Sequence, residues 1–219
     1  MNSAASRPTV NAKSCLFLII LAVTGCALPS HPARPAVYDF GPGAKTTSSA
    51  LDAGRLTPLV VAEVEANAAL DNNAVLYRLA YADDQQLRPY AQARWSMTPA
   101  QLIRQRLRER LGQRRLLLNP EDNIGPSANA QSSPPLTLRV EIEEFSQLFE
   151  TPDKSVGLLR LRATLKQPGA TGPKLVAQHS IVTQRSAPSA DAFGGVRALT
   201  AATDAAVLEI EQWLQGLDR

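Results

Sequence analysis

The sequence predicts an α+β fold: a largely antiparallel sheet with two amphipathic helices packed on one of its faces. Several segments alternate apolar and polar residues with a period of two, which is typical of strands with one wet face. Two other segments repeat apolar residues at helical spacing. Elements of these two kinds form a layered domain when the helices cover the apolar side of the sheet.

Residues 1–25 are typical of a bacterial signal peptide. Arg7 and Lys13 precede an apolar run over 15–23, and no acidic residue occurs before Cys26. The run is shorter than the roughly 18 to 20 residues that a membrane-spanning helix needs. It leads into Val-Thr-Gly-Cys at 23–26, which resembles the bacterial lipobox. In that motif the cysteine receives a diacylglycerol, is cleaved on its amino side, and is then N-acylated, so Cys26 is the predicted lipid attachment site.

A lipidated Cys26 would begin a proline-rich tether over 26–36. The attached chains should hold the domain on a membrane, because each buried methylene contributes about 0.8 kcal/mol and one chain alone binds only marginally. Cys15 would leave with the signal peptide, so the mature chain could form no internal disulfide. By resemblance to enterobacterial sorting rules, Ala27 favours the periplasmic leaflet of the outer membrane over the inner membrane.

The first predicted strands lie between the tether and the first helix. Residues 37–40 suit a short strand, and 59–64 are rich in β-branched residues and apolar on both faces, which predicts a buried central strand. Residues 75–81 alternate as a half-buried strand should, and 90–95 form a short strand beside it. The loose, small-residue stretch at 41–54 is predicted to be loop.

The first helix is predicted from Thr98 to about Gly112. Thr98 can cap it, Pro99 suits the first helical position, and Gln101 can complete a capping box. Its apolar stripe is bordered on both sides by arginines, whose stems can cover the stripe while the guanidinium groups stay in water. An anionic lipid or an acidic partner is the alternative interpretation of these side chains, which are Arg104, Arg106, Arg108, Arg110, Arg114 and Arg115.

The second half of the chain predicts an antiparallel meander. Residues 136–142 and 159–166 each alternate, and their exposed rows carry opposite charges, as suits strands paired in a hairpin. Glu144 and Phe145 interrupt the first alternation, which indicates a bulge. The loop at 167–173 then leads into a further strand over 175–184.

The last helix is predicted to begin between Ser189 and Phe193 and to run almost to the carboxyl end. Leu208 projects away from its apolar arc and is a candidate partner contact. The arc predicted to face the core consists of Val196, Leu199, Thr203, Val207, Ile210, Trp213, Leu214 and Leu217.

The sequence predicts no catalytic, cofactor-binding or metal site, and so no enzyme. The mature chain has two histidines, His31 and His179, and one blocked cysteine, too few for a metal cluster or a Cys-His pair. The net charge is +3, and two of the positive charges lie in the leader, so nucleic-acid binding is not expected. The adjacent glycines Gly194 and Gly195 suit a helix start better than a nucleotide site.

Two clusters invite a functional interpretation. Glu141, Glu143 and Glu144 could be catalytic carboxylates, although a solvated strand face with a bulge is the favoured interpretation. Arg94 and Trp95 could form a stacked contact on a partner surface or a structural cation–π pair, the latter being favoured. Together with Leu208, these two residues are the predicted partner surface.

The order of elements resembles the ABC-type transport auxiliary lipoprotein family. The resemblance rests on Tyr-Asp-Phe at 38–40, on the strand ending Tyr-Arg-Leu-Ala-Tyr at 77–81, and on 87–95 leading into a Pro-started, Leu/Arg-rich helix. It implies that residues 37–219 form one such domain. The long polar insertion at 121–133 departs from the family pattern.

Membership would imply a non-catalytic, periplasm-facing docking lipoprotein of a phospholipid transport system. Its partner would be a mammalian-cell-entry-type periplasmic protein, the ATPase would be another chain, and the lipoprotein could act as a homo-oligomer. The alternative is a lipid- or lipopolysaccharide-assembly binding lipoprotein of the outer membrane. No cofactor is implied beyond the covalent diacylglycerol and N-acyl lipid on Cys26.

Overall fold

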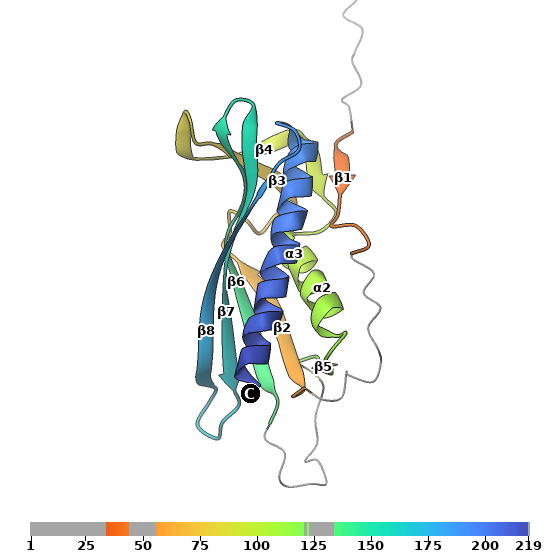
Figure 1. Cartoon of the computed structure of the whole chain (residues 1–219), viewed down its shortest axis with the longest axis vertical. Helices are drawn as coiled ribbons and strands as arrows, with labels where there is room; N and C mark the ends of the chain where they lie inside the picture. Colours follow the sequence, from red (N-terminus) through yellow and green to blue (C-terminus); the bar gives the residue numbers. More distant parts are fainter. Residues whose placement is uncertain (1–33, 44–55, 121, 123–133, 219) are drawn as a thin grey trace, which may run out of the picture. The chain divides into compact units, whose positions relative to one another are not determined.

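The computed structural model describes residues 34–43, 56–120, 122 and 134–218. Its helices and strands belong to the unit formed by residues 35–219 (Figure 1). The predicted signal peptide, Cys26, most of the tether and most of the insertion at 121–133 lie outside the described residues.

Most predicted elements are present, and several are longer than predicted. The 16-residue β6 continues well past the bulge, whose register shift lies between Ile142 and Glu144. The short β5 was not predicted, and the strand expected at 90–95 begins already at Asp83. In chain order the elements are β1 (Ala36–Tyr38), β2 (Leu59–Ala66), β3 (Ala74–Leu79), β4 (Asp83–Trp95), α2 (Pro99–Leu111), β5 (Leu117–Leu118), β6 (Leu136–Thr151), β7 (Lys154–Gln167), β8 (Lys174–Ser186) and α3 (Ala192–Leu217).

The eight described strands form one mixed sheet, so the expectation of a largely antiparallel sheet is wrong. The predicted meander of β6, β7 and β8 is antiparallel. The other edge of β6, however, pairs in parallel with β2 near its start and with β3 near its end. β1 is parallel to β4, and β5 is parallel to β2.

The parallel pairs follow from the connections. Antiparallel neighbours can be joined by a tight turn, whereas parallel neighbours need a long crossover. The chain between β3 and β6 contains the β3–β4 hairpin and α2, which is long enough to bring β6 back beside β2 and β3 in the same direction. The alternation of residues within each strand does not carry this information, because it is the same for either pairing.

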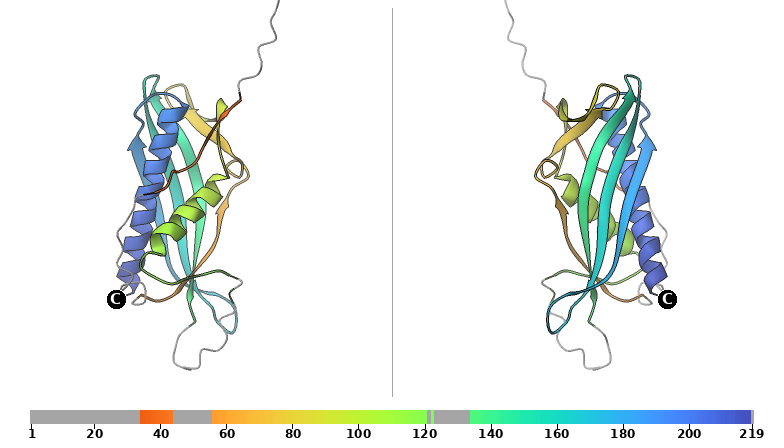
Figure 2. Two further views of the ribbon diagram at one scale, coloured as in Figure 1. Left: turned by 90° about the vertical axis from the view of Figure 1, so that its right-hand side faces the viewer. Right: turned by 90° about the vertical axis from the view of Figure 1, so that its left-hand side faces the viewer.

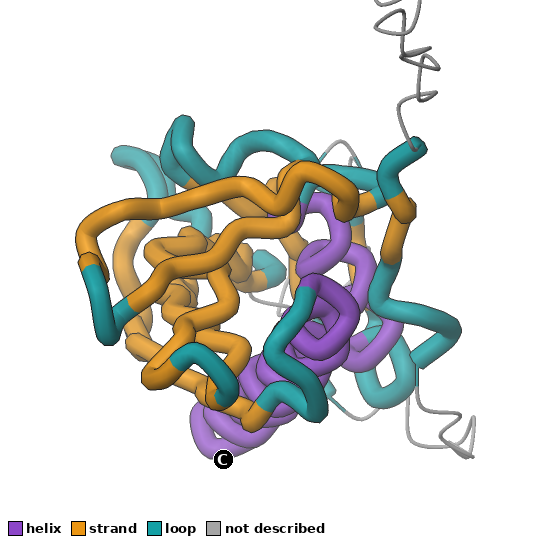
Figure 3. Tube along the Cα trace, turned by 90° about the horizontal axis from the view of Figure 1, so that it is seen from above, coloured by secondary structure: helices purple, strands orange, loops and turns teal. Residues whose placement is uncertain are grey.

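Both helices lie on one face of the sheet, as predicted (Figure 2). α3 packs along β7 and β8, α2 packs on β2, and the two helices contact each other. Seen from above, the strands curve along one side of the helix pair (Figure 3). The face of the sheet opposite the helices is lined by charged rows such as Arg139 of β6 and Arg162 of β7, which pair with Glu65 and Glu143.

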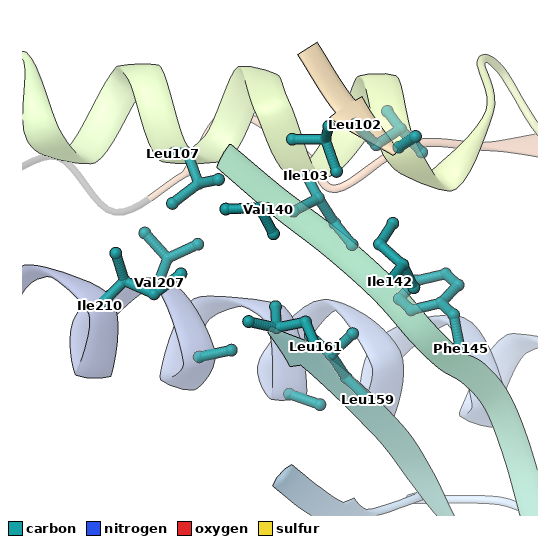
Figure 4. Packing of buried hydrophobic residues seen from close by; sticks show 14 of the residues in the cluster. Leu102, Ile103, Leu107, Val140, Ile142, Phe145, Leu159, Leu161, Val207 and Ile210 are labelled. Atoms are coloured by element: carbon teal, nitrogen blue, oxygen red, sulfur yellow. The ribbon is translucent and has the colours of Figure 1, made fainter. Parts of the chain in front are cut away.

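The core fills the space between the helices and the sheet (Figure 4). Leu107 of α2 and Ile210 of α3 are fully buried, together with the inward residues of β6 and β7. The predicted arc of α3 is confirmed except at its end, where Trp213 is half-buried and Leu217 is 46% exposed. Gly157 of β7 allows α3 to approach closely, because a Cβ there would lie 2.5 Å from the backbone of Ala198.

Candidate functional site

An open groove with a volume of about 740 Å³ lies between α2 and α3. Pro42 and Gly43 border it on the side of α2, and Arg185 at the end of β8 borders it on the side of the sheet. Its floor is formed by α3 through Ala201, Ala205, Val207 and Leu208. The polar groups lining it are Arg106, Glu109, Arg110, Gln113, Arg185 and Asp204.

The apolar part of the groove is a stripe on α3. Ala201, Ala205 and Leu208 are spaced by four and three residues, which places them on one side of the helix. Ala201 is exposed, Ala205 is half-buried, and Leu208 is 40% exposed. The neighbouring positions Ala202 and Ala206 are fully buried against the sheet side. Leu208, the predicted partner contact, therefore lies within the groove.

Arginines of α2 and the turn after it bind acidic residues of α3. Arg110 Nε lies 2.7 Å from Glu211 Oε2, and Arg114 Nε lies 3.6 Å from the other oxygen of the same carboxylate. Arg115 reaches Asp218 at 2.7 Å just beyond the end of α3. Glu211 and Arg115 are each only 4% exposed. The prediction that these guanidinium groups stay in water is therefore wrong for Arg115, whereas the Arg110 and Arg114 side chains remain 34% and 57% exposed.

Arg106 is the most constrained charged residue beside the groove. Its guanidinium donates hydrogen bonds to the backbone oxygens of Phe40 and Gly41 and lies over the Phe40 ring. It also lies 3.5 Å from Asp204 and 3.8 Å from Glu109. Arg106 thus fixes the segment after β1 to α2 and to α3 at once.

Asp204 and Arg185 are two charged residues that line the groove. Burial raises the pKa of the Asp204 carboxyl, and the nearby Arg106 guanidinium opposes that rise without cancelling it. Arg185 is exposed, and within the described part of the chain the one hydrogen bond that its side chain makes is to the backbone oxygen of Gln184, at 2.8 Å. The groove therefore presents one cation without an acidic partner among the described residues.

Trp95 is not part of any surface. It is 1% exposed and packs against Phe40 and Phe145, with ring centroids 5.4 Å and 5.6 Å apart. The prediction that Trp95 belongs to a partner surface is therefore wrong, because its indole packs inside an aromatic cluster with Phe40 and Phe145. The cation–π contacts in the described residues involve Arg106 and Arg197, not Arg94.

The three residues of the predicted partner surface are not one site. Arg94 is exposed on β4, where it lies between Val37 of β1 and Ala74 of β3. Leu208 lies on α3 in the groove. Only Leu208 is retained as a candidate contact of that groove.

A buried polar chain near the start of α3 resembles a binding site but has no room for a ligand. The Tyr90 hydroxyl donates to Gln147 Oε1 at 2.8 Å, and Gln147 Nε2 donates to Ser155 Oγ at 2.7 Å. Burial raises the pKa of Tyr90 well above its usual range, so the phenol is neutral and suited to donate. Gly195 packs so closely that a Cβ there would meet Gln147 Oε1 at 2.0 Å. This cluster therefore joins α3 to β4, β6 and β7.

Two of the three carboxylates considered as catalytic, Glu143 and Glu144, are held in ion pairs across strands. Glu144 accepts hydrogen bonds from Arg78 and Ser146, and Glu143 pairs with Arg162. His179 lies 2.9 Å from Glu209 and stacks on Trp213. Across residues 34–43, 56–120, 122 and 134–218, no three His, Cys, Asp or Glu side chains gather where they could hold a metal ion.

Neither helix in the described part of the chain has the length and apolarity that crossing a bilayer requires.

The charged residues that the sequence analysis missed are Asp204, Glu211 and Arg185, of which Asp204 and Arg185 line the groove. Asp204 and Glu211 are seven residues apart on α3, which places them on the same side of a helix. Two acidic residues on one side of α3, together with the many arginines of α2, could have predicted ion pairs between the two helices. Arg185 carried no such signal, because its position depends on where β8 ends beside α3.

Two solved structures have this fold. A protein from Xanthomonas campestris is 17% identical with a TM-score of 0.62, and the match covers 81% of this chain and 94% of that one. An uncharacterized protein is 15% identical with a TM-score of 0.57, over 83% of this chain and 99% of that one. At this identity the two similarities establish the fold alone. No curated protein matches the chain.

The sequence shows the family to which the chain belongs. Residues 38–211 match a family of lipoproteins that accompany transporters. The match extends over most of the chain, from β1 to the last turns of α3. The protein belongs to the family described as the ABC-type transport auxiliary lipoprotein component, and the resemblance noted in the sequence is confirmed.

Proposed function

We propose that this chain is a non-catalytic docking subunit of an ABC-type phospholipid transport system. Cys26 carries its lipid anchor in the periplasmic leaflet of the outer membrane, and its partner is a mammalian-cell-entry-type periplasmic protein. Family membership supports a role in ABC-type transport. The partner, the cargo, the membrane and the lipidated residue are the parts proposed here.

The groove between α2 and α3 is the observation that carries the docking role. Most of α3 is packed against the sheet, yet Ala201, Ala205 and Leu208 line an open hollow. Two small residues beside an exposed leucine let a partner helix or loop approach closely and cover Leu208. An acidic side chain of that partner would neutralise Arg185 at the rim.

The lining argues for docking rather than for carriage of a lipid. A pocket for acyl chains is enclosed and predominantly apolar. This groove is open and is lined by Arg106, Glu109, Arg110, Arg185 and Asp204 besides its apolar floor. An acyl chain laid in the groove would remove these charged side chains from water, which is costly.

Self-association fits the same proposal. β8 pairs with β7, and no described strand covers its other edge over the 13 residues from Lys174 to Ser186. Leu175 and Val182 are exposed on this strand. A long open edge can pair with the same strand of a second copy. Light scattering on the purified protein measures whether a homo-oligomer forms.

The docking role is tested by co-purification from envelope membranes with Leu208→Arg. The protein with its natural sequence should recover a mammalian-cell-entry-type protein as its main partner. Leu208→Arg should reduce that recovery at least about tenfold, because the arginine would bury a charge where an apolar contact is needed. Leu217→Arg is the matched control, since Leu217 is a similarly exposed leucine on α3 outside the groove, and it should leave recovery unchanged.

Equal recovery by both variants would exclude the groove as the docking surface. Recovery of outer-membrane assembly proteins alone would contradict the transport role and favour the lipopolysaccharide-assembly alternative.

A further inference from the structure

β1 sets the direction in which the chain leaves the domain toward the tether. It runs parallel to β4, with Ala36 opposite Ala93 and Tyr38 opposite Trp95. Going backward from Ala36, the chain therefore points toward the earlier residues of β4, where Tyr90 lies. Tyr90 is linked through Gln147 to the first turn of α3. β1 therefore begins near the end of the domain that holds the start of α3 (Figure 1).

The reach of the tether is short compared with α3. The segment 27–35 between Cys26 and β1 spans at most roughly 30 Å at about 3.1 Å per residue. The 26 residues of α3 extend for about 39 Å at 1.5 Å per residue. A membrane that holds Cys26 is therefore within reach of the start of α3. The end of α3 lies farther from the start of that helix than this segment can span.

An aromatic side chain and a cation are exposed at this same end. Phe193, in the first turn of α3, is 50% exposed, and the guanidinium carbon of Arg197 lies 5.6 Å from its ring centroid. The β3–β4 turn lies at this same end (Figure 1), and Tyr81 in this turn is a second exposed aromatic residue. Aromatic rings favour the membrane–water interface, and arginine suits the level of the lipid phosphates.

Two of the acidic groups nearby, Asp191 and Asp153, are bonded within the fold, whereas Asp83 and Asp84 beside Tyr81 are exposed. Asp191 caps α3 by accepting from the Gly194 backbone N–H at 2.7 Å, and it also accepts from Ser189. Asp153 in the β6–β7 turn accepts from Thr151. These bonds keep both carboxylates turned toward the backbone of their own turns.

We propose that the end of the domain holding the start of α3 faces the bilayer, and that Phe193 and Arg197 contact the headgroup region of a phospholipid surface. This rests on the proposed anchor at Cys26. The orientation leaves the carboxyl end of α3, with Leu217, directed away from the membrane. It also leaves the groove between α2 and α3 open along the side of the domain for a protein partner.

Fluorescence quenching by nitroxide-labelled lipids tests the orientation. Phe193→Cys, Tyr81→Cys and Leu217→Cys are made in the full-length, membrane-extracted lipoprotein, labelled with one fluorophore, and reconstituted into phosphatidylethanolamine–phosphatidylglycerol vesicles. Acylation blocks Cys26, so each variant has a single reactive thiol. Labels at 193 and 81 should be quenched several-fold more strongly than the label at 217.

Equal quenching at the two ends, or stronger quenching at 217, would overturn the orientation. Failure of the anchor itself has a different signature. The protein would then remain in the vesicle supernatant, and each variant would take up a second label at a free Cys26, which would overturn the orientation together with the proposed anchor.

Discussion

Single arginine side chains of α2 and the following turn hold the two helices together through ion pairs. Five of these arginines form ion pairs with acidic residues. Only one of the acidic partners, Glu63, lies outside the two helices and their ends. Glu211 receives two arginines while almost entirely buried. A carboxylate removed from water in this way depends on its partners, because an unpaired buried charge is costly.

Arg110→Gln should lower the free energy of unfolding by about 1 to 3 kcal/mol, the cost of leaving a buried acceptor poorly satisfied. Arg114→Gln is the control, because Arg114 is more exposed and lies farther from the carboxylate, at 3.6 Å, and it should cost less. Urea denaturation of both variants measures the difference. An equal loss for the two would show that Arg110 is not the main partner of Glu211.

Sequence reasoning predicted which residues are apolar and inward but not which charges meet. The burial of Ile103, Leu107 and Leu111 follows from helical spacing and is confirmed. The burial of Trp95 and the pairing of Arg110 with Glu211 depend on packing between segments far apart in the chain. Spacing along one element cannot supply that information.

At the scale of elements, strand periodicity predicted the meander of β6, β7 and β8 but not the partners on the other edge of β6. The first half of β4 was missed because Asp83 to Arg88 are mostly polar and exposed, so they show no alternation. β5 was missed because two residues are too few to show a period.

The close contact between α3 and β7 requires glycine at position 157. Gly157→Ala should destabilise the fold by about 1 to 3 kcal/mol, because the new methyl group overpacks a rigid backbone contact. That contact is 2.5 Å from the added carbon to the Ala198 backbone. Gly216→Ala is the matched control: no atom lies within 4 Å of the place that its added methyl group would take, and in a helix it should be neutral or stabilising. Thermal unfolding measures both, and an unchanged midpoint for Gly157→Ala would contradict the close approach.

The start of α3 depends on the Asp191 cap. Asp191→Ala should lower stability by about 0.5 to 2 kcal/mol, whereas Asp191→Asn keeps an acceptor for the Gly194 N–H and should lose less. Hydrogen bonds from the Gly194 backbone and from Ser189 hold the pKa of the Asp191 carboxyl below its usual value of 3.8. A carboxyl whose pKa is lower in the folded than in the unfolded state stabilises the fold fully at pH values above its unfolded-state pKa. That stabilisation is lost as the pH falls through the folded-state pKa.

The difference in stability between the natural sequence and Asp191→Ala should therefore be constant above about pH 5 and shrink below the ordinary aspartate pKa. Urea midpoints measured from pH 7 to pH 3 give this profile. A difference that grows toward low pH would contradict the cap.

At the scale of the whole molecule, the described domain and its proposed anchor are separate parts with separate roles. The described helices and strands all lie within residues 35–219, and the predicted lipid site at Cys26 lies before them in sequence. Cys26→Ser should leave the unfolding midpoint unchanged and move the protein from the membrane fraction to the soluble fraction. Fractionation with circular dichroism checks both, and a variant that stays in the membranes would show that the lipid is not what holds the protein there.

We propose that Leu208 lies at the contact with a mammalian-cell-entry-type transport protein. A photo-cross-linking amino acid is placed at position 208 in cells, with position 217 as the control. Position 208 should yield one dominant cross-linked product containing that protein, and position 217 should yield little. Products at both positions in equal amount, or none at 208, would contradict the account.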